Sequence, residues 1–176
     1  MLCEALGAYK MTSHLIKNKT YLLRFLNEEI EAYMRHTRMK NDEVKALKSA
    51  AQTIYWACTL DEFFKKNFAE YKAFRMSDEA SKIMSGVRYA RNRVSHQFTQ
   101  LLYITEGACI PTPVPTPLFE IRWKSIKQPP LPDGESKKES LAHCYAEVLA
   151  KKPVRVGFKS IQDFFKRFSE AFPTCA

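Results

Sequence analysis

The sequence predicts a mainly α-helical fold, an antiparallel helical bundle followed by a small accessory section. The chain has 176 residues, of which 45% are hydrophobic and only 5 are glycine, a composition that favours helices in a folded domain. In the N-terminal part, apolar residues recur at spacings of three and four, as on one face of a helix. Further on, a proline-rich stretch and a short alternating stretch interrupt this pattern, which predicts an extended arm and one or two strands.

Two helical runs open the chain. The first covers about residues 15–40, and a polar break at residues 41–42 separates it from the second. Residues 59–62 have the Thr-x-x-Glu form of a capping box, which would begin a new helix there. The sequence alone leaves open whether residues 44–76 form one helix or two. The apolar face of the first run consists of Leu22, Phe25, Leu26, Ile30 and Tyr33.

A third helix is predicted over residues 77–105, where Ser77 can cap its first turn. At about 100° per residue, one stripe of this helix consists of Ile83, Val87, Ala90, Val94, Phe98 and Leu101. An opposite row consists of Arg88, Asn92 and His96. We therefore expect this polar row to face away from the core. Arg91 lies at the edge between stripe and row, close to Ser95.

The C-terminal part is predicted to pack on the same domain, so that residues 1–106 form the bundle and residues 107–176 the accessory section. Prolines at positions 111, 113, 115 and 117 predict an extended arm, and Asp133-Gly134 predicts a turn. Residues 118–124 alternate as a strand, with Phe119, Ile121 and Trp123 on its apolar face. A strand needs a partner, for which we expect residues 154–156. Two further helices are expected at residues 138–151 and 160–172.

Charge and cysteine content narrow the class of protein. The net charge of +9 favours polyanionic partners such as nucleic acid, although a merely soluble basic surface would give the same value. The five cysteines have neither metal-site spacing nor the pattern of a disulfide framework. We therefore expect no metal, no cofactor and reduced thiols in the cytoplasm. No signal peptide is expected, because residues 1–14 lack a basic segment followed by an apolar core. No membrane-spanning helix is expected, because charges interrupt every long apolar stretch.

The Arg and His residues of the third helix suit one reaction, the cleavage of RNA without a metal. The 2′-hydroxyl must lose a proton to attack the adjacent phosphorus, and the leaving 5′-oxygen must gain one. A histidine titrates near neutrality and can serve either purpose. A guanidinium can hold the negative charge that develops at phosphorus. A two-fold dimer would supply the second histidine that the reaction needs.

The stretch RNRVSH at residues 91–96 resembles the signature of the HEPN superfamily (higher eukaryotes and prokaryotes nucleotide-binding domains). In that signature an Arg is followed after four to six residues by a His, commonly with a polar residue directly after the Arg. Arg91, Asn92 and His96 match these three positions, and the resemblance covers about residues 15–105. It implies an all-α bundle that dimerises, with active members that are metal-independent endoribonucleases in toxin–antitoxin, defence and RNA-processing systems.

Three hypotheses for function remain open at this stage. The first is a dimeric ribonuclease of HEPN type that acts on RNA, with a possible neutralising protein partner. The second is a non-catalytic module of the same fold that binds nucleic acid or a nucleotide. The third is a helical interaction protein whose charge is incidental. In the first, the expected site consists of Arg91 and His96 as catalytic residues, Asn92 and Ser95 as supporting residues, and Arg88 and Arg93 as nucleic-acid contacts.

Overall fold

Six helices and one two-stranded sheet account for the part of the chain that the computed structural model describes, which comprises residues 2–77, 81–106, 119–125 and 136–172. For residues 2–13, 77, 93–100, 106 and 136–140 this description covers the backbone and not the side chains. The predicted fold class is confirmed: the chain is mainly helical with a small antiparallel sheet. In chain order the elements are α1 (Leu2–His36), α2 (Glu43–Asn67), α3 (Ala69–Ser77), α4 (Ser81–Leu101), β1 (Leu102–Glu106), β2 (Phe119–Trp123), α5 (Ser136–Val148) and α6 (Val154–Ala171).

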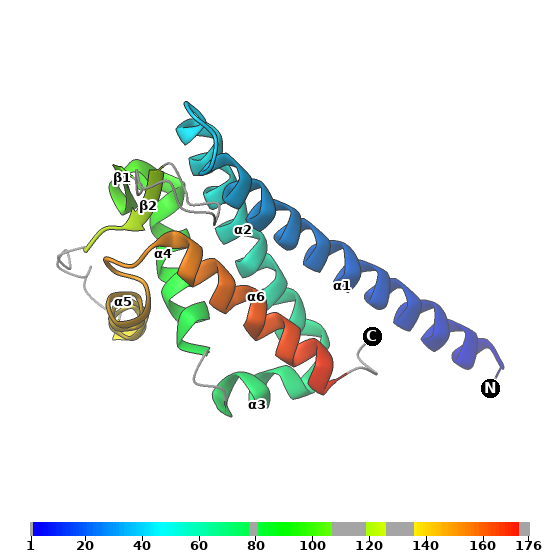
Figure 1. The fold of residues 1–176 in the computed structure, drawn as a ribbon. Helices are drawn as coiled ribbons and strands as arrows, with labels where there is room; N and C mark the ends of the chain where they lie inside the picture. The colour runs from blue at the N-terminus through cyan, green and yellow to red at the C-terminus, as the bar shows by residue number, and fades with distance from the viewer. Residues whose placement is uncertain (1, 78–80, 107–118, 126–135, 173–176) are drawn as a thin grey trace.

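The helices pack around α2 and α4. Helix α1 pairs with α2, and the short α3 connects α2 to α4, which returns beside α2 in the opposite direction (Figure 1). Helix α5 packs against another side of α4, and α6 contacts α1, α2 and α4 together (Figure 1). Because α4 has neighbours on several sides, more than one of its faces is covered.

Residues 44–76 form two helices, but the break does not lie at the predicted capping box. Helix α2 runs without interruption through residues 59–62, where the Thr59 hydroxyl donates to the Tyr55 carbonyl one turn earlier. The break lies at Phe68, whose backbone is extended. There the Asn67 side chain folds back and donates to the Phe63 carbonyl in the last turn of α2 at 2.7 Å.

The other helix boundaries lie within several residues of the predicted ones, except at the N-terminus. Helix α1 begins at Leu2 instead of residue 15 and ends at His36. The predicted break at residues 41–42 is confirmed, with Asn41 at a positive φ of 63°, a conformation that Asn tolerates better than most residues.

The sheet forms in a different way from the one expected. Helix α4 ends at Leu101, and the chain continues directly as β1, which pairs with β2 in antiparallel register from Leu102–Trp123 to Glu106–Phe119. The expected partner, residues 154–156, belongs instead to the first turn of α6. The backbone just before that turn bonds to β2, because Lys151 donates to the Trp123 carbonyl at 2.8 Å.

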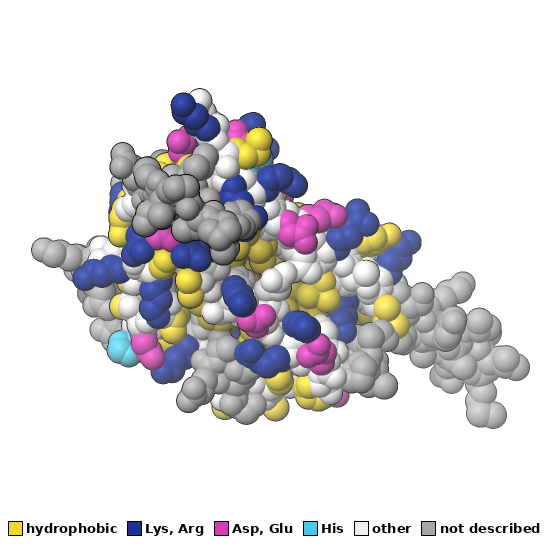
Figure 2. All heavy atoms as spheres, viewed as in Figure 1, with side chains coloured by type: hydrophobic (Ala, Val, Ile, Leu, Met, Phe, Trp, Pro, Cys, Tyr) yellow, Lys and Arg dark blue, Asp and Glu magenta, His cyan; other side chains and the backbone are white. Residues whose placement is uncertain are grey.

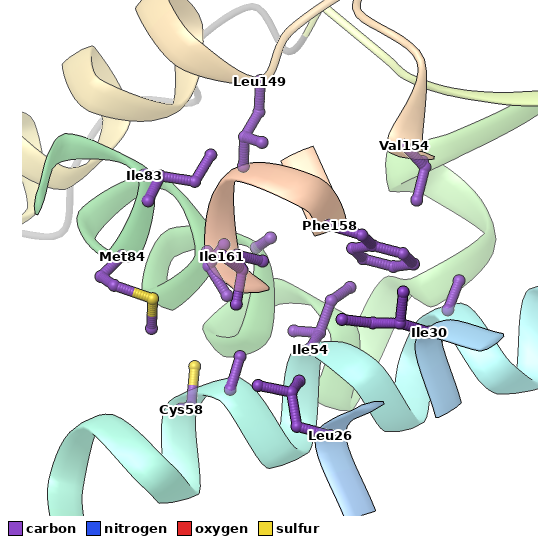
Figure 3. Packing of buried hydrophobic residues seen from close by; sticks show 14 of the residues in the cluster. Leu26, Ile30, Ile54, Cys58, Ile83, Met84, Leu149, Val154, Phe158 and Ile161 are labelled. Carbon is purple, nitrogen blue, oxygen red and sulfur yellow. The ribbon is translucent and has the colours of Figure 1, made fainter. Parts of the chain in front are cut away.

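The described residues share one hydrophobic core, to which distant segments contribute. Side chains of α1, α2, α4 and α6 converge there with Leu149, which follows α5 (Figure 3). The predicted apolar face of β2 is confirmed, since Phe119, Ile121 and Trp123 are buried. The proline arm at residues 111–117 and the turn at residues 133–134 lie outside the described residues.

Trp123 anchors the C-terminal part to this core. It is fully buried and meets the Tyr145 ring edge-to-face at 6.0 Å. We expect Trp123→Ala to lower the free energy of unfolding by about 3–5 kcal/mol, as for other large aromatic residues removed from a core. Urea denaturation would measure the change. Ile104→Thr is the matched control, because Ile104 lies in the same sheet at 42% exposure and its replacement should cost about 0.5 kcal/mol or less. Equal losses in both variants would contradict this prediction.

Candidate functional site

Arg88 does not point away from the protein, as the helical wheel predicted, but toward α2. Its Nε and Nη2 lie 2.7 and 2.6 Å from Oδ2 of Asp61, and the side chain is only 26% exposed. The wheel assumed one buried face, whereas α4 packs against α2 on one flank and α5 on another. On the α5 side, Tyr89 is buried against Tyr145. The predicted apolar stripe itself is confirmed at Ile83, Val87, Ala90 and Leu101, which are buried.

Asp61 is a carboxylate without solvent exposure, on the buried side of α2. Tyr71 donates its hydroxyl to Oδ1 at 2.7 Å. Nζ of Lys65 lies 3.2 Å from Oδ2, and Nε of Arg75 lies 3.3 Å from Oδ1. We call these residues, which come from three helices, the Asp61 cluster; its members are Asp61, Lys65, Tyr71, Arg75 and Arg88.

The cluster shifts the ionisation of its own members. Burial, together with the negative charge of Asp61, raises the pKa of the Tyr71 hydroxyl far above its ordinary value. Tyr71 therefore remains a hydrogen-bond donor at any physiological pH. The pKa of Lys65 is lowered, chiefly because burial disfavours its charged form and also because Arg75 and Arg88 are close. The attraction of Asp61 opposes this effect without cancelling it.

The sequence interpretation of Asp61 and Glu62 as helix-capping residues is wrong. Both lie within α2, well before its end at Asn67. A signal for the buried role was present in the spacing, since Asp61 lies four residues after Ala57 and three before Phe64, both buried. An acidic residue on an apolar stripe indicates a paired buried charge.

Arg91 forms a different kind of contact with the neighbouring residue of α2. Its Nη1 lies 2.9 Å from Oε1 of Glu62, and the two side chains are 38% and 51% exposed. An ion pair in contact with water contributes little to stability. The Arg91 guanidinium is therefore held near α2 by a weak contact that another anion can replace.

Arg93, Ser95 and His96 lie in α4, and their side chains are outside the described part of the structure. The helical backbone puts residue 96 about 7.5 Å beyond residue 91 along the axis. Asn92 is exposed. The structure thus brings Arg88 and Arg91 together with α2, and assigns the other predicted site residues to positions on the same helix.

The remaining chemistry of the described residues is limited. Burial raises the pKa of the Cys58 thiol to about 12, so Cys58 is an inert core residue. Within the described ranges, no group of three or more His, Cys, Asp and Glu side chains is arranged to hold a metal ion, and none of the helices described has the length and apolar character of a membrane span. Figure 2 shows one face of the molecule, on which Lys and Arg side chains are interspersed with Asp and Glu.

Comparisons of the chain with protein-family models, with curated proteins and with solved structures give no match.

The two acidic neighbours on α2 should differ sharply in their effect on stability. We expect Asp61→Asn to lower the free energy of unfolding by roughly 3–5 kcal/mol, because it leaves the cations of the cluster without their buried counter-charge. Glu62→Gln, the matched control one residue away, should cost less than about 1 kcal/mol. Urea denaturation of both variants would measure the difference, and a loss of similar size in the two would show that Asp61 is not the organising charge.

Proposed function

We propose that this protein is a metal-independent endoribonuclease of HEPN type, with Arg91 and His96 of α4 as its catalytic residues. The proposal includes a cytoplasmic homodimer in which the two α4 helices meet, because one chain supplies a single histidine at this motif. A toxin or defence role with a neutralising protein partner belongs to the same proposal. The free thiols of Cys58 and Cys144 are compatible with a reducing compartment.

The observation that carries the proposal is the exposed, weakly held guanidinium of Arg91. A phosphodiester can take the place of Glu62 at this guanidinium, since phosphate accepts two parallel hydrogen bonds from Arg. His96 follows five residues later on the same helix, about 7.5 Å farther along its axis. In the whole chain Lys and Arg outnumber Asp and Glu, which supports a polyanionic substrate.

Each residue then has a defined role. His96 of one protomer takes the proton from the 2′-hydroxyl, and the same residue of its partner gives a proton to the leaving 5′-oxygen. Arg91 stabilises the negative charge on the phosphorane oxygens. Asn92 and Ser95 orient these groups. The products are a 2′,3′-cyclic phosphate and a free 5′-hydroxyl, so that no water and no metal enters the bond-breaking step.

The contacts of Arg88 limit its part in this reaction. Its Nε and Nη2 are committed to Asp61, so Arg88 can offer a substrate only its remaining donors. We assign Arg88 and Arg93 to phosphates that flank the cleaved bond.

The purified protein should cut single-stranded RNA in the presence of a chelator, and DNA of the same sequence should survive because it lacks the 2′-hydroxyl. His96→Ala and Arg91→Ala should each abolish cleavage. Gel analysis of end-labelled RNA, with identification of the cyclic phosphate, would measure this. His143→Ala is the matched control, because His143 is exposed on α5 and its loss should leave cleavage unchanged.

Cleavage that survives His96→Ala, or that requires added metal, would contradict the mechanism. Light scattering that shows a strict monomer at micromolar concentration would contradict the dimer on which it depends. Binding of RNA without cleavage under any condition would favour the non-catalytic binding module, which needs only the cations that the structure describes beside α2.

Removal of the competing carboxylate should strengthen substrate binding. We expect Glu62→Gln to lower the KM for RNA by about two- to five-fold, the equivalent of one exposed ion pair. Glu28→Gln is the matched control, since it also removes one exposed carboxylate paired with an Arg, on α1. Steady-state kinetics at low salt would compare the two. An unchanged KM in Glu62→Gln would mean that Arg91 does not exchange Glu62 for phosphate.

A further inference from the structure

The Asp61 cluster carries more positive than negative charge. Three cations, Lys65, Arg75 and Arg88, surround a single carboxylate, which leaves two positive charges in excess. Arg88 alone already forms two short contacts with Asp61. Two further partly buried cations cost desolvation energy, which an anionic ligand would offset.

We propose that Lys65, Arg75 and Arg88 bind a phosphate group of a nucleic-acid backbone, next to the phosphate that Arg91 holds. Asp61 is the positioning residue of this site, because its buried carboxylate lies within ion-pair distance of all three cations. The inference rests on the proposed ribonuclease function and extends its substrate contacts by one phosphate.

The cations retain donors for a ligand. A guanidinium has five N–H donors, and Arg88 directs two of its nitrogen atoms at Asp61. Nη2 of Arg75 has only a 3.5 Å contact with Ser85, whereas its Nε is buried beside Asp61 and is not a donor for the ligand. The side chains of Arg75, Arg88 and Lys65 are 18%, 26% and 31% exposed, so the cluster is accessible at its outer edge.

The geometry of α2 and α4 aligns this site with Arg91. Arg88 and Arg91 are three residues apart on α4, so they are neighbours on the same face of the helix. Their acidic partners are consecutive residues of α2. Arg75 belongs to α3, which precedes α4, and Arg88 and Arg91 follow in that order along α4 toward residue 96. A single strand that lies along α4 would meet the Asp61 cluster first and Arg91 next.

The ionisation of Lys65 depends on the charges beside it. Its pKa is lowered by burial and by the two neighbouring arginines, so the cluster repels part of its own charge. A bound phosphate would reverse that effect by adding negative charge beside the ammonium group.

The salt dependence of binding tests the site without any need for cleavage. Short oligouridylate is bound to the His96→Ala variant, which cannot cut it, and the slope of log affinity against log salt concentration is measured. Adding Lys65→Gln together with Arg75→Gln should reduce this slope by about 0.7, the value for one phosphate contact on a single strand. Both residues are farther from Asp61 than Arg88 is, so the Asp61–Arg88 pair, and with it the fold, should persist. Lys65→Gln alone, checked by its melting temperature, should reduce the slope in the same direction.

The matched control is the double variant Lys48→Gln and Lys159→Gln, which removes two exposed positive charges from elsewhere on α2 and from α6. It should leave the slope unchanged. Oligothymidylate should behave like oligouridylate, because the site recognises phosphate and not the 2′-hydroxyl. Inorganic phosphate, at a concentration equal to that of the phosphate groups in the oligonucleotide, should not displace either strand.

If the salt slope is the same with and without Lys65→Gln and Arg75→Gln in the His96→Ala protein, the phosphate site is overturned, even if the wild-type protein cleaves RNA. Displacement of the strands by inorganic phosphate would also overturn it, because the cluster would then hold a free anion. A reduced slope in a protein that never cleaves RNA would support the phosphate site and refute the proposed catalysis.

Discussion

The buried carboxylate of Asp61 is the constraint on which this part of the structure depends. A charge without contact with water is tolerated only when oppositely charged and hydrogen-bonding groups surround it. Asp61 therefore requires Arg88 of α4 at short range, and Tyr71 of α3 donates a hydrogen bond to it. These contacts determine how α3 and α4 approach α2, and an apolar residue at position 61 would specify no such arrangement.

Two consecutive acidic residues of α2 have opposite physical roles because one is buried and the other is exposed. The Asp61 carboxylate has no contact with water, so its contact with Arg88 is structural. Glu62 holds Arg91 at the surface, where water and other anions compete with it. The same two helices thus combine a buried ion pair with an exposed one, only one turn apart. The proposed phosphate contact depends on this partly exposed guanidinium of Arg91.

The C-terminal part of the chain supports α4 from the other side. Helix α4 continues without a loop into β1, which pairs with β2, and β2 brings Trp123 into the core. Tyr145 of α5 packs against both Trp123 and Tyr89 of α4. The helix that carries the candidate site is therefore held between α2 on one flank and α5 on another, which limits its motion relative to both.

Local pattern was sufficient to predict the helices, the apolar stripe of α4 and the buried face of β2. These features follow from periodicity, which neighbouring residues in the chain carry by themselves. The break at Phe68 and the strand β1 were missed, although the run of Tyr103, Ile104 and Thr105 has the β-branched and aromatic character of a strand. These residues follow α4 without a break, so the predicted helix was extended over them to residue 105.

The sequence by itself determined that Arg88, Arg91 and His96 share one helix, because their spacing needs only the helical repeat. The tertiary structure alone decided which of these residues face a partner. The acidic residues that bind Arg88 and Arg91 lie 27 and 29 positions earlier in the chain, beyond the reach of any local pattern. A helical wheel shows where side chains point relative to their own helix, and only the packing of α2 against α4 pairs Arg88 with a buried carboxylate and Arg91 with an exposed one.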